Sequence, residues 1–347
     1  MRGKFIVETT LVSTMLTQNE GLSSLLKWRN EPIALQRNLR EFDLKINSDE
    51  LVKFIRDVLD ALFSIMMETE GTYRFNNLEN QVFKNLIKCI SLITEEGDYK
   101  STAPVTNLKH HFIPILELYI NENFYHMLAY DKLLDVLAEL LENAVRTPAE
   151  VAKVLECLKY VFKFIVKSRL LYSEFHKEHK EEANQGYFEE KLKEVLDSLT
   201  RLMSYQSKEL HNAQSACLRN MIQSIPDLAK VYSQKKLAEV LKGMIKALPE
   251  EQLEDVKLDV IKELIRSEIF KDRDCRLILL PQITHELRQI LERCQNTTLR
   301  RNIAVAGKKD TERVEQCTST LGEVLDVLYA ISREKGAEKI HEGKYES

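Results

Sequence analysis

Apolar residues recur at spacings of three and four along most of this 347-residue chain, and no other feature of the sequence constrains the fold as strongly. The clearest instance runs from Leu51 to Met66, where apolar positions share one face of a helix and charged positions share the other. A helix packed along one side requires this spacing. Asn47 or Ser48 is expected to cap the exposed amides at its start.

The same period predicts a succession of helices. They are expected at residues 22–29, 32–43, 51–66, 78–93, 109–120, 124–143, 151–172, 187–204, 208–224, 234–247, 251–269, 273–294 and 310–333. Thr147 and Glu150 have the spacing of a capping box, with Pro148 at the first helical position. Pro226 is expected to mark a connection and Pro249 to open a helix. Residues 94–108 and 295–310 are predicted to be long loops.

The fold class follows from these helices and from the residues that are scarce. Sandwiches and α/β folds need many glycine-rich turns, whereas this chain has only 10 Gly and 7 Pro. Short connections favour consecutive helices as antiparallel neighbours, and the pairs recur about every 40–50 residues, as in HEAT and armadillo proteins. The sequence predicts an all-α fold, an irregular armadillo/HEAT-like α-solenoid of antiparallel helix pairs.

The N-terminus has a different period. From Phe5 to Leu16 a β-branched run alternates in the manner of a strand. A single strand needs a sheet, so we expect residues 1–19 to be the last strand and exit of a preceding β domain. The predicted organisation is therefore 1–19, a helical solenoid at 20–333, and a polar, disordered tail at 334–347.

Composition bounds the location of the chain and its partners. Net charge is −4 with acids and bases interleaved, so no global field draws the molecule onto nucleic acid. The six cysteines form no CxxC pair and sit among apolar neighbours, which is typical of reduced core thiols. No apolar run approaches the ~20 residues that span a bilayer, and the first residues do not resemble a signal peptide. A cytoplasmic location is expected.

Catalytic and metal-binding patterns are weak. His176, His179 and Glu182 follow one another at intervals of three and would share a helix face as metal ligands, although a solvated helix end is the simpler interpretation. His110 and His111 are adjacent and would point about 100° apart. The sequence contains no GxSxG, P-loop or GxGxxG motif. We therefore predict no catalytic, cofactor-binding or metal-binding residue.

One charged surface is a candidate for binding. Lys235, Lys236, Lys242 and Lys246 approximately share a face of the helix predicted at 234–247. This lysine stripe would attract an acidic lipid or an acidic partner, and the alternative is an ordinary solvated face.

Four stretches of the sequence together resemble one family. They are Leu16-Thr17-Gln18-Asn19 leading to Leu25-Leu26-Lys27-Trp28-Arg29; Glu50-Leu51-Val52-Lys53-Phe54 to Asp60-Ala61-Leu62-Phe63; Tyr160 to Arg169; and Asp274-Cys275-Arg276 through Leu279-Leu280-Pro281 to Leu291-Glu292-Arg293. In this order and spacing they resemble the dedicator of cytokinesis (DOCK) family, nearest its Rac-directed members. The resemblance covers roughly Phe5 to Arg293.

The resemblance implies an armadillo-like region between a C2-like lipid-binding domain and a C-terminal domain that exchanges nucleotide on Rac-type GTPases. No residue of the exchange domain has a counterpart here. The favoured hypothesis is a non-catalytic scaffold that holds the flanking domains of its parent in register. Its implied partners are those domains and, through the parent, a Rac-type GTPase, adaptor proteins and the plasma membrane. The alternative is a stand-alone helical-repeat adaptor that binds protein or lipid.

Overall fold

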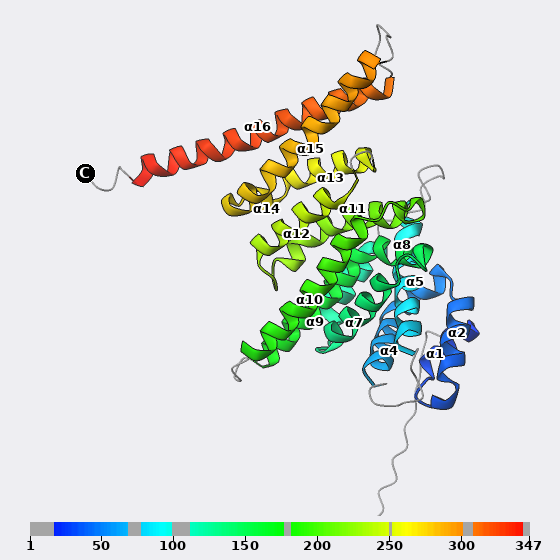
Figure 1. The fold of residues 1–347 in the computed structure, drawn as a ribbon. Coiled ribbons are helices and arrows are strands. Elements are labelled where there is room, and N and C mark those ends of the chain that lie inside the picture. Colours follow the sequence, from blue (N-terminus) through cyan, green and yellow to red (C-terminus); the bar gives the residue numbers. More distant parts are fainter. Residues whose placement is uncertain are drawn as a thin grey trace, which may run out of the picture. The chain divides into compact units, whose positions relative to one another are not determined.

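The computed structural model describes residues 17–68, 78–98, 112–176, 182–249, 252–300 and 308–342. In these ranges all regular secondary structure is helical, which confirms the predicted all-α class (Figure 1). The strand predicted at Phe5–Leu16 lies outside the described residues. The chain divides into two compact units, Met1–Tyr119 and Ile120–Ser347.

The first unit begins with two helices that pack closely. Its elements are α1 Glu20–Leu26, the 3-10 turn Pro32–Ala34, α2 Leu35–Lys45, α3 Ser48–Lys53, α4 Ile55–Glu68, α5 Leu78–Asp98 and α6 Phe112–Leu118. Asn19 caps α1 by accepting from the Leu22 amide at 3.0 Å, and its side-chain amide donates to the Lys45 carbonyl at 2.8 Å. One residue therefore starts α1 and joins it to the end of α2.

Gly21 sets the distance between α1 and α2. A Cβ at this position would lie 2.7 Å from the carbonyl oxygen of Glu41 and 3.0 Å from the Cα of Phe42. Both are backbone atoms, so a side chain could be accommodated only by moving the helices apart.

We predict that Gly21→Ala destabilises the first unit by about 1–3 kcal/mol, because overpacking outweighs the gain in helix propensity. Gly186→Ala is the matched control, since a Cβ there meets nothing within 4 Å. It should be neutral or stabilising by up to about 1 kcal/mol. Urea denaturation followed by circular dichroism measures the free energy of unfolding of both variants. Equal effects of the two substitutions would contradict this account of Gly21.

The helix expected at 51–66 is divided at Phe54. Asn47 is the cap of α3, since its side-chain oxygen accepts from the Glu50 amide at 2.9 Å, which confirms one of the two predicted caps. Phe54 leaves the helical region (φ −120°, ψ 19°), and its amide is shared between the carbonyls of Glu50 and Leu51. The change of axis lets both segments bury their apolar side chains. The spacing of apolar residues alone does not predict where such a break occurs.

The second unit contains the remaining elements. They are the π-helical turn Tyr119–Asn123 at its start, α7 Ala129–Glu142, α8 Pro148–Glu156, α9 Leu158–Phe175, α10 Glu182–Met203, the 3-10 turn Lys208–Leu210, α11 His211–Leu228, α12 Gln234–Ala247, α13 Glu254–Arg266, α14 Glu268–Lys271, α15 Arg273–Arg300 and α16 Lys308–Glu342.

Helices of the second unit contact one another in two rows. In one row α7 packs on α10, α10 on α12, and α12 on α15. In the other, α8 and α9 pack on α11, α11 on α13, and α13 on α16. Each helix thus meets helices close to it in sequence, as in a stack of repeats whose core grows in one direction (Figure 1).

Several predicted helix boundaries are wrong. In two cases the chain changes direction inside a predicted helix. The helix expected at 151–172 is broken at Cys157, and the one expected at 251–269 is broken at Ser267, which is extended. Leu253 has φ +55°, so α13 begins after a left-handed residue rather than at Pro249. Pro226 lies inside α11 near its end instead of marking a connection.

Other boundaries moved outward. Helix α5 continues through Asp98 and α15 through Arg300, so residues 94–98 and 295–300, which were predicted to be loops, are helical. Helix α16 reaches Glu342, so residues 334–342 are helical although we expected a frayed tail. Helix α8 begins at Pro148 as predicted, but Thr147 makes no side-chain cap; its hydroxyl donates to the Asn143 carbonyl at 3.4 Å.

Candidate interaction surfaces

The lysine stripe lies on α12, and most of its charges meet acidic side chains. Lys235 pairs with Asp274 on α15 at 2.6 Å, and Lys236 pairs with Glu189 on α10 at 2.6 Å. Lys242 pairs with Glu239 within α12 at 3.3 Å. Lys246 is exposed and forms no ion pair with any residue that the structure describes. Three of the four lysines are therefore engaged by this chain itself.

These pairs link neighbouring helices of one row. The hydrogen bond from Lys236 lowers the pKa of Glu189, and the same bond raises the pKa of Lys236. The ammonium of Lys236 also lies 5.2 Å from the centre of the Tyr232 ring. Because an exposed pair of this kind contributes little to stability, these contacts mainly fix where the side chains lie. The stripe presents less free positive charge than its sequence suggests.

A polar cluster at the end of α9 holds the connection that precedes α7. The Ser168 hydroxyl donates to the His126 carbonyl at 2.7 Å and accepts from the Tyr130 amide at 3.0 Å. Lys167 donates to the Asn121 carbonyl at 2.7 Å. Residues 124–128 were predicted to be helical and are not. Ser168 and Lys167 satisfy backbone groups within this connection and at both of its ends.

Arg169 is buried beside this cluster. Its guanidinium carbon lies 5.7, 5.3 and 5.2 Å from the ring centres of Tyr130, Tyr172 and Phe188. It donates to Gln185 at 2.8 Å, and Gln185 donates to Glu189 at 3.0 Å. Stacking on aromatic rings offsets part of the cost of burying a cation. The Lys167-Ser168-Arg169 sequence is therefore a packing motif that joins α9 to α7 and α10.

His126 lies under this cluster and is 8% exposed. Its ring stacks on Tyr125 at 4.2 Å and meets Phe124 at 5.7 Å. Burial disfavours the charged imidazolium and lowers the pKa of His126 to about 4.

A pH dependence of stability follows from this histidine. Between pH 6.5 and about 4 the unfolded chain binds a proton that the folded chain does not, so stability falls as the pH falls through this window. We expect a loss of about 1–2 kcal/mol by pH 5 from this residue. His126→Phe keeps an aromatic ring and should flatten the profile in urea denaturation between pH 7.5 and 5. An unchanged slope would contradict the assignment.

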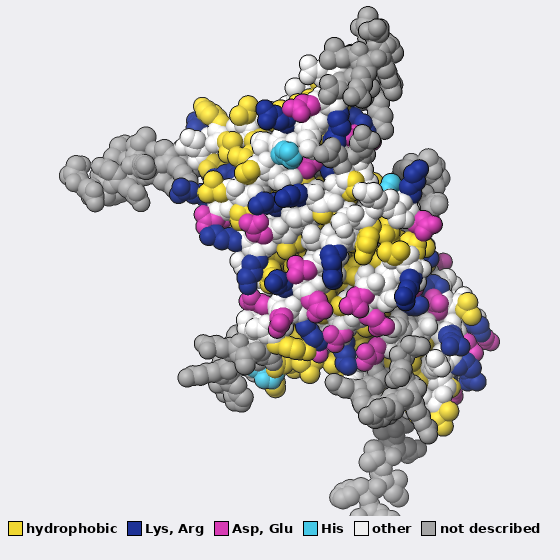
Figure 2. All heavy atoms as spheres, viewed as in Figure 1, with side chains coloured by type: hydrophobic (Ala, Val, Ile, Leu, Met, Phe, Trp, Pro, Cys, Tyr) yellow, Lys and Arg dark blue, Asp and Glu magenta, His cyan; other side chains and the backbone are white. Residues whose placement is uncertain are grey.

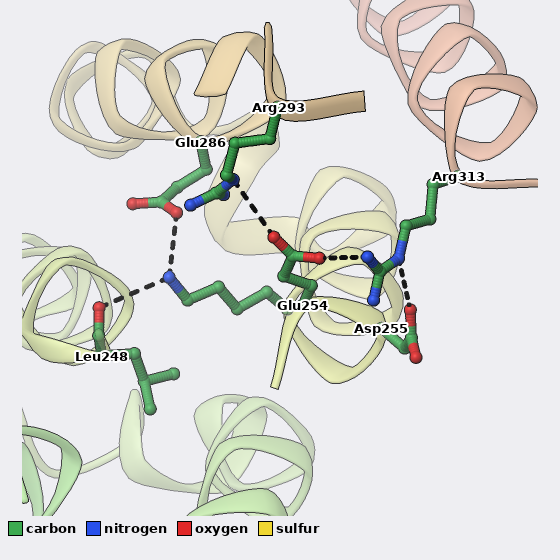
Figure 3. Close-up of polar contacts among 7 residues, drawn as sticks. Leu248, Glu254, Asp255, Glu286, Arg293 and Arg313 are labelled. Carbon is green, nitrogen blue, oxygen red and sulfur yellow. Dashed lines mark hydrogen bonds and ion pairs between the residues drawn. The ribbon is translucent and has the colours of Figure 1, made fainter. Parts of the chain in front are cut away.

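Charged residues are also buried where α13, α15 and α16 meet (Figure 3). Lys257, 1% exposed at the side chain, lies 3.0 Å from Glu286, which is 5% exposed. Glu254 lies between two guanidinium groups, 3.2 Å from Arg293 and 2.5 Å from Arg313. Figure 3 shows these side chains converging from three helices. Most of their charge is compensated inside the structure, as buried charge requires.

We predict that Lys257→Met destabilises the second unit by about 3–5 kcal/mol, because the Glu286 carboxylate is left buried without its cation. Lys257→Met combined with Glu286→Leu should recover most of this loss, since both charges are then gone. Arg288→Met is the control, on the same helix as Glu286. It removes the exposed pair with Glu292 and should cost less than about 1 kcal/mol. Thermal unfolding and urea denaturation measure these variants and Glu286→Leu alone, and additive effects of Lys257→Met and Glu286→Leu in the double variant would contradict the pairing.

The histidines and the glutamate that were considered as metal ligands are only partly described. His179 lies outside the described residues, as do His110 and His111, and the side chain of Glu182 is not described. The His176 ring nitrogen Nδ1 is 2.9 Å from the Tyr172 carbonyl, and its ring stacks on Tyr172 at 4.1 Å. Among the described side chains no group of three His, Cys, Asp or Glu is arranged to hold a metal.

The six cysteines are buried, as predicted, and none of them forms a disulfide. They are Cys89, Cys157, Cys217, Cys275, Cys294 and Cys317. Burial raises the pKa of Cys275 to about 12 and that of Cys317 to about 11, which disfavours the reactive thiolate. In the described part of the chain no helix is long and apolar enough to cross a membrane.

The helical stack can now be compared with known proteins. A sequence model of the region described as "Dedicator of cytokinesis (DOCK) TPR region" matches residues 31–342. The chain belongs to the dedicator of cytokinesis family. It is 30% identical to human dedicator of cytokinesis protein 4 over 297 residues, 82% of this chain and 14% of that protein. It is 29% identical to mouse dedicator of cytokinesis protein 3 over 293 residues, 82% of this chain and 13% of that protein.

The chain therefore spans about a seventh of the length of these DOCK relatives. The family resemblance seen in the sequence is confirmed, and residues from two of the stretches that carry it make packing contacts. Ser168 and Arg169 join α9 to its neighbours. Arg276, from another such stretch, donates to the carbonyls of Phe270 and Lys271 at 3.1 and 2.8 Å, closing the end of α14.

Sequence reasoning did not single out the buried charges Lys257, Glu286 and Glu254. A signal was present, because Lys257 precedes Val260, Ile261 and Leu264 by three, four and seven residues. A charge at that spacing lies on the apolar face of its helix. Its partner on another helix could not be identified from one sequence.

Proposed function

We propose that this chain is the scaffold segment of a DOCK-type guanine-nucleotide exchange factor for Rac-family GTPases. In this role it carries no catalytic site and holds a lipid-binding domain and an exchange domain of its parent at a fixed separation. Recruitment of the parent from the cytoplasm to the plasma membrane would then place the exchange site near its membrane-bound substrate. The single observation that supports the proposal most is the family match over nearly the whole helical stack.

The physical basis of such a role is rigidity. In the second unit successive helices share one core, and buried groups such as Ser168 and Lys257 join helices that are not adjacent in sequence. A stack of this kind resists bending because each contact must break for a neighbouring pair to move. The proposed division of the chain fits this role. Residues 1–19 would connect to the lipid-binding domain, residues 20–333 would form the helical stack, and residues 334–347 would lead toward the exchange domain.

The first test concerns catalysis. We expect the purified chain, added to Rac loaded with a fluorescent nucleotide, to leave the rate of nucleotide release unchanged, whereas the parent protein accelerates it. Acceleration by the chain alone would overturn the non-catalytic role. The scaffold is tested in the parent, where Lys257→Met should reduce exchange on membranes more than exchange in solution. Arg288→Met is the matched control and should change neither, and equal loss in both settings would contradict a scaffolding role.

The alternative, a stand-alone adaptor that binds acidic lipid or protein through the lysine stripe, is tested on the same purified chain. Of the four lysines, Lys246 is the best candidate for contacting a lipid or a partner, because Lys235 and Lys236 are paired with acids on other helices. Loss of acidic-vesicle binding on Lys246→Glu would support the adaptor. Pull-down and vesicle binding that are both unchanged by Lys246→Glu would remove it.

A further inference from the structure

The end of α9, the start of α10 and the connection before α7 expose large apolar side chains. Phe175, the last residue of α9, is 71% exposed, Tyr187 on α10 is 49% exposed, and Leu128, which precedes α7, is 46% exposed. Single apolar residues are normal on a protein surface, whereas a group of them at one place marks an interaction site. We call these three residues the apolar patch.

A chain of ring contacts joins the three helix ends that carry the apolar patch. The ring centre of Phe175 lies 5.1 Å from that of His176, which lies 4.1 Å from that of Tyr172. Tyr172 meets Tyr130 on α7 at 5.9 Å, and Tyr130 meets Phe188 on α10 at 5.4 Å. The patch is therefore held on a fixed surface, and a partner that binds it loses little free energy to ordering.

Acidic side chains continue from the patch along α10. Tyr187 is followed by Glu190, Glu194 and Asp197 at intervals of three, four and three residues, so all four lie within about 80° around the helix. These three acids, which we call the acidic stripe, are exposed and form no ion pair with any residue that the structure describes. Lys193 flanks the stripe, which spans about 10 Å along the helix.

The start of α7 adds negative charge beside the patch. Asp131 and Asp135 both pair with Lys191 of α10, at 2.6 and 2.7 Å. One ammonium thus serves two carboxylates, and it lies 5.0 Å from the ring centre of Tyr187. Figure 2 shows acidic side chains gathered over α7 and α10. On α12, by contrast, most of the lysine stripe is paired with acids of this chain.

We propose that the apolar patch and the acidic stripe together bind a basic amphipathic segment of a partner protein. The lysines and arginines of this segment lie along the acidic stripe, and its apolar side chains pack on Phe175 and Tyr187. A cation is also attracted to the face of an aromatic ring, so the exposed rings favour a basic partner as well. Exposed aromatic anchors beside complementary charge are typical of a binding surface.

The charge of this surface selects among the classes of partner. The phosphate groups of an anionic membrane or of a nucleic acid are repelled by the acidic stripe, whereas a basic segment is attracted and steered by it. Salt screens the stripe because its carboxylates are exposed, but it does not screen the contact with the apolar patch. The inference does not depend on the proposed scaffold function, because it concerns only the surface of this chain.

Fluorescence anisotropy of a labelled synthetic peptide, added to the full chain, tests the proposal. The probe is an amphipathic helix with leucines on one face and lysines and arginines on the other. The same peptide with glutamates in place of its bases is the control. We expect micromolar binding of the basic probe at low salt and no binding of the acidic one. Glu194→Lys and Phe175→Ser should each weaken binding at least about fivefold, since the first reverses a charge of the stripe and the second removes the most exposed ring of the patch.

Two further variants are matched controls. Asp326→Lys reverses an exposed acid on α16, and Leu44→Ser changes an 82% exposed leucine on α2, so both should leave binding unchanged. Circular dichroism checks that all four variants remain folded. No binding by the unsubstituted chain would overturn the proposal, as would an equal loss with Asp326→Lys. Binding that falls with salt but is indifferent to Phe175→Ser would show only a general attraction to negative charge, and would equally overturn it.

Discussion

The second unit depends on the burial of apolar stripes between helices that follow one another in two rows. Each helix packs one face on the helix before it in its row and another face on the helix after it. The core therefore runs along the stack instead of being gathered at one point. The segment from Val151 to Val166 shows this most clearly, because it is buried on several sides. Such a core fixes the order of the helices but leaves their exact junctions to other interactions.

Those junctions are set by a few polar groups inside the stack. Ser168 satisfies backbone groups on a connection, Arg169 lies among three rings, and Lys257 pairs with Glu286. Apolar packing tolerates small slides of one helix along another, whereas a hydrogen bond or buried ion pair tolerates almost none. Ser168 and Arg169, which belong to one of the stretches that carry the family resemblance, thus act in the packing between helices.

Much of this fold was predictable from one sequence, because amphipathic period is a local property. The all-α class, most helices, the Asn47 cap and the buried thiols are direct consequences of it. The breaks at Phe54, Cys157 and Ser267 were not predictable, since both halves of each segment keep the same period. The lysines of the stripe lie on α12, but the pairing of Lys235 with Asp274 and of Lys236 with Glu189 joins residues 39 and 47 positions apart through tertiary packing, which one sequence does not show.

The six buried thiols have a practical consequence. They lie at separate places along the stack, in α5, between α8 and α9, in α11, in α15 and in α16, and a reagent can reach each one only when its surroundings open. The alkylation rate of each thiol therefore reports how often the helices around it open. Mass spectrometry of a labelling time course would show which helix pairs open first, and whether the stack comes apart from an end or from the middle.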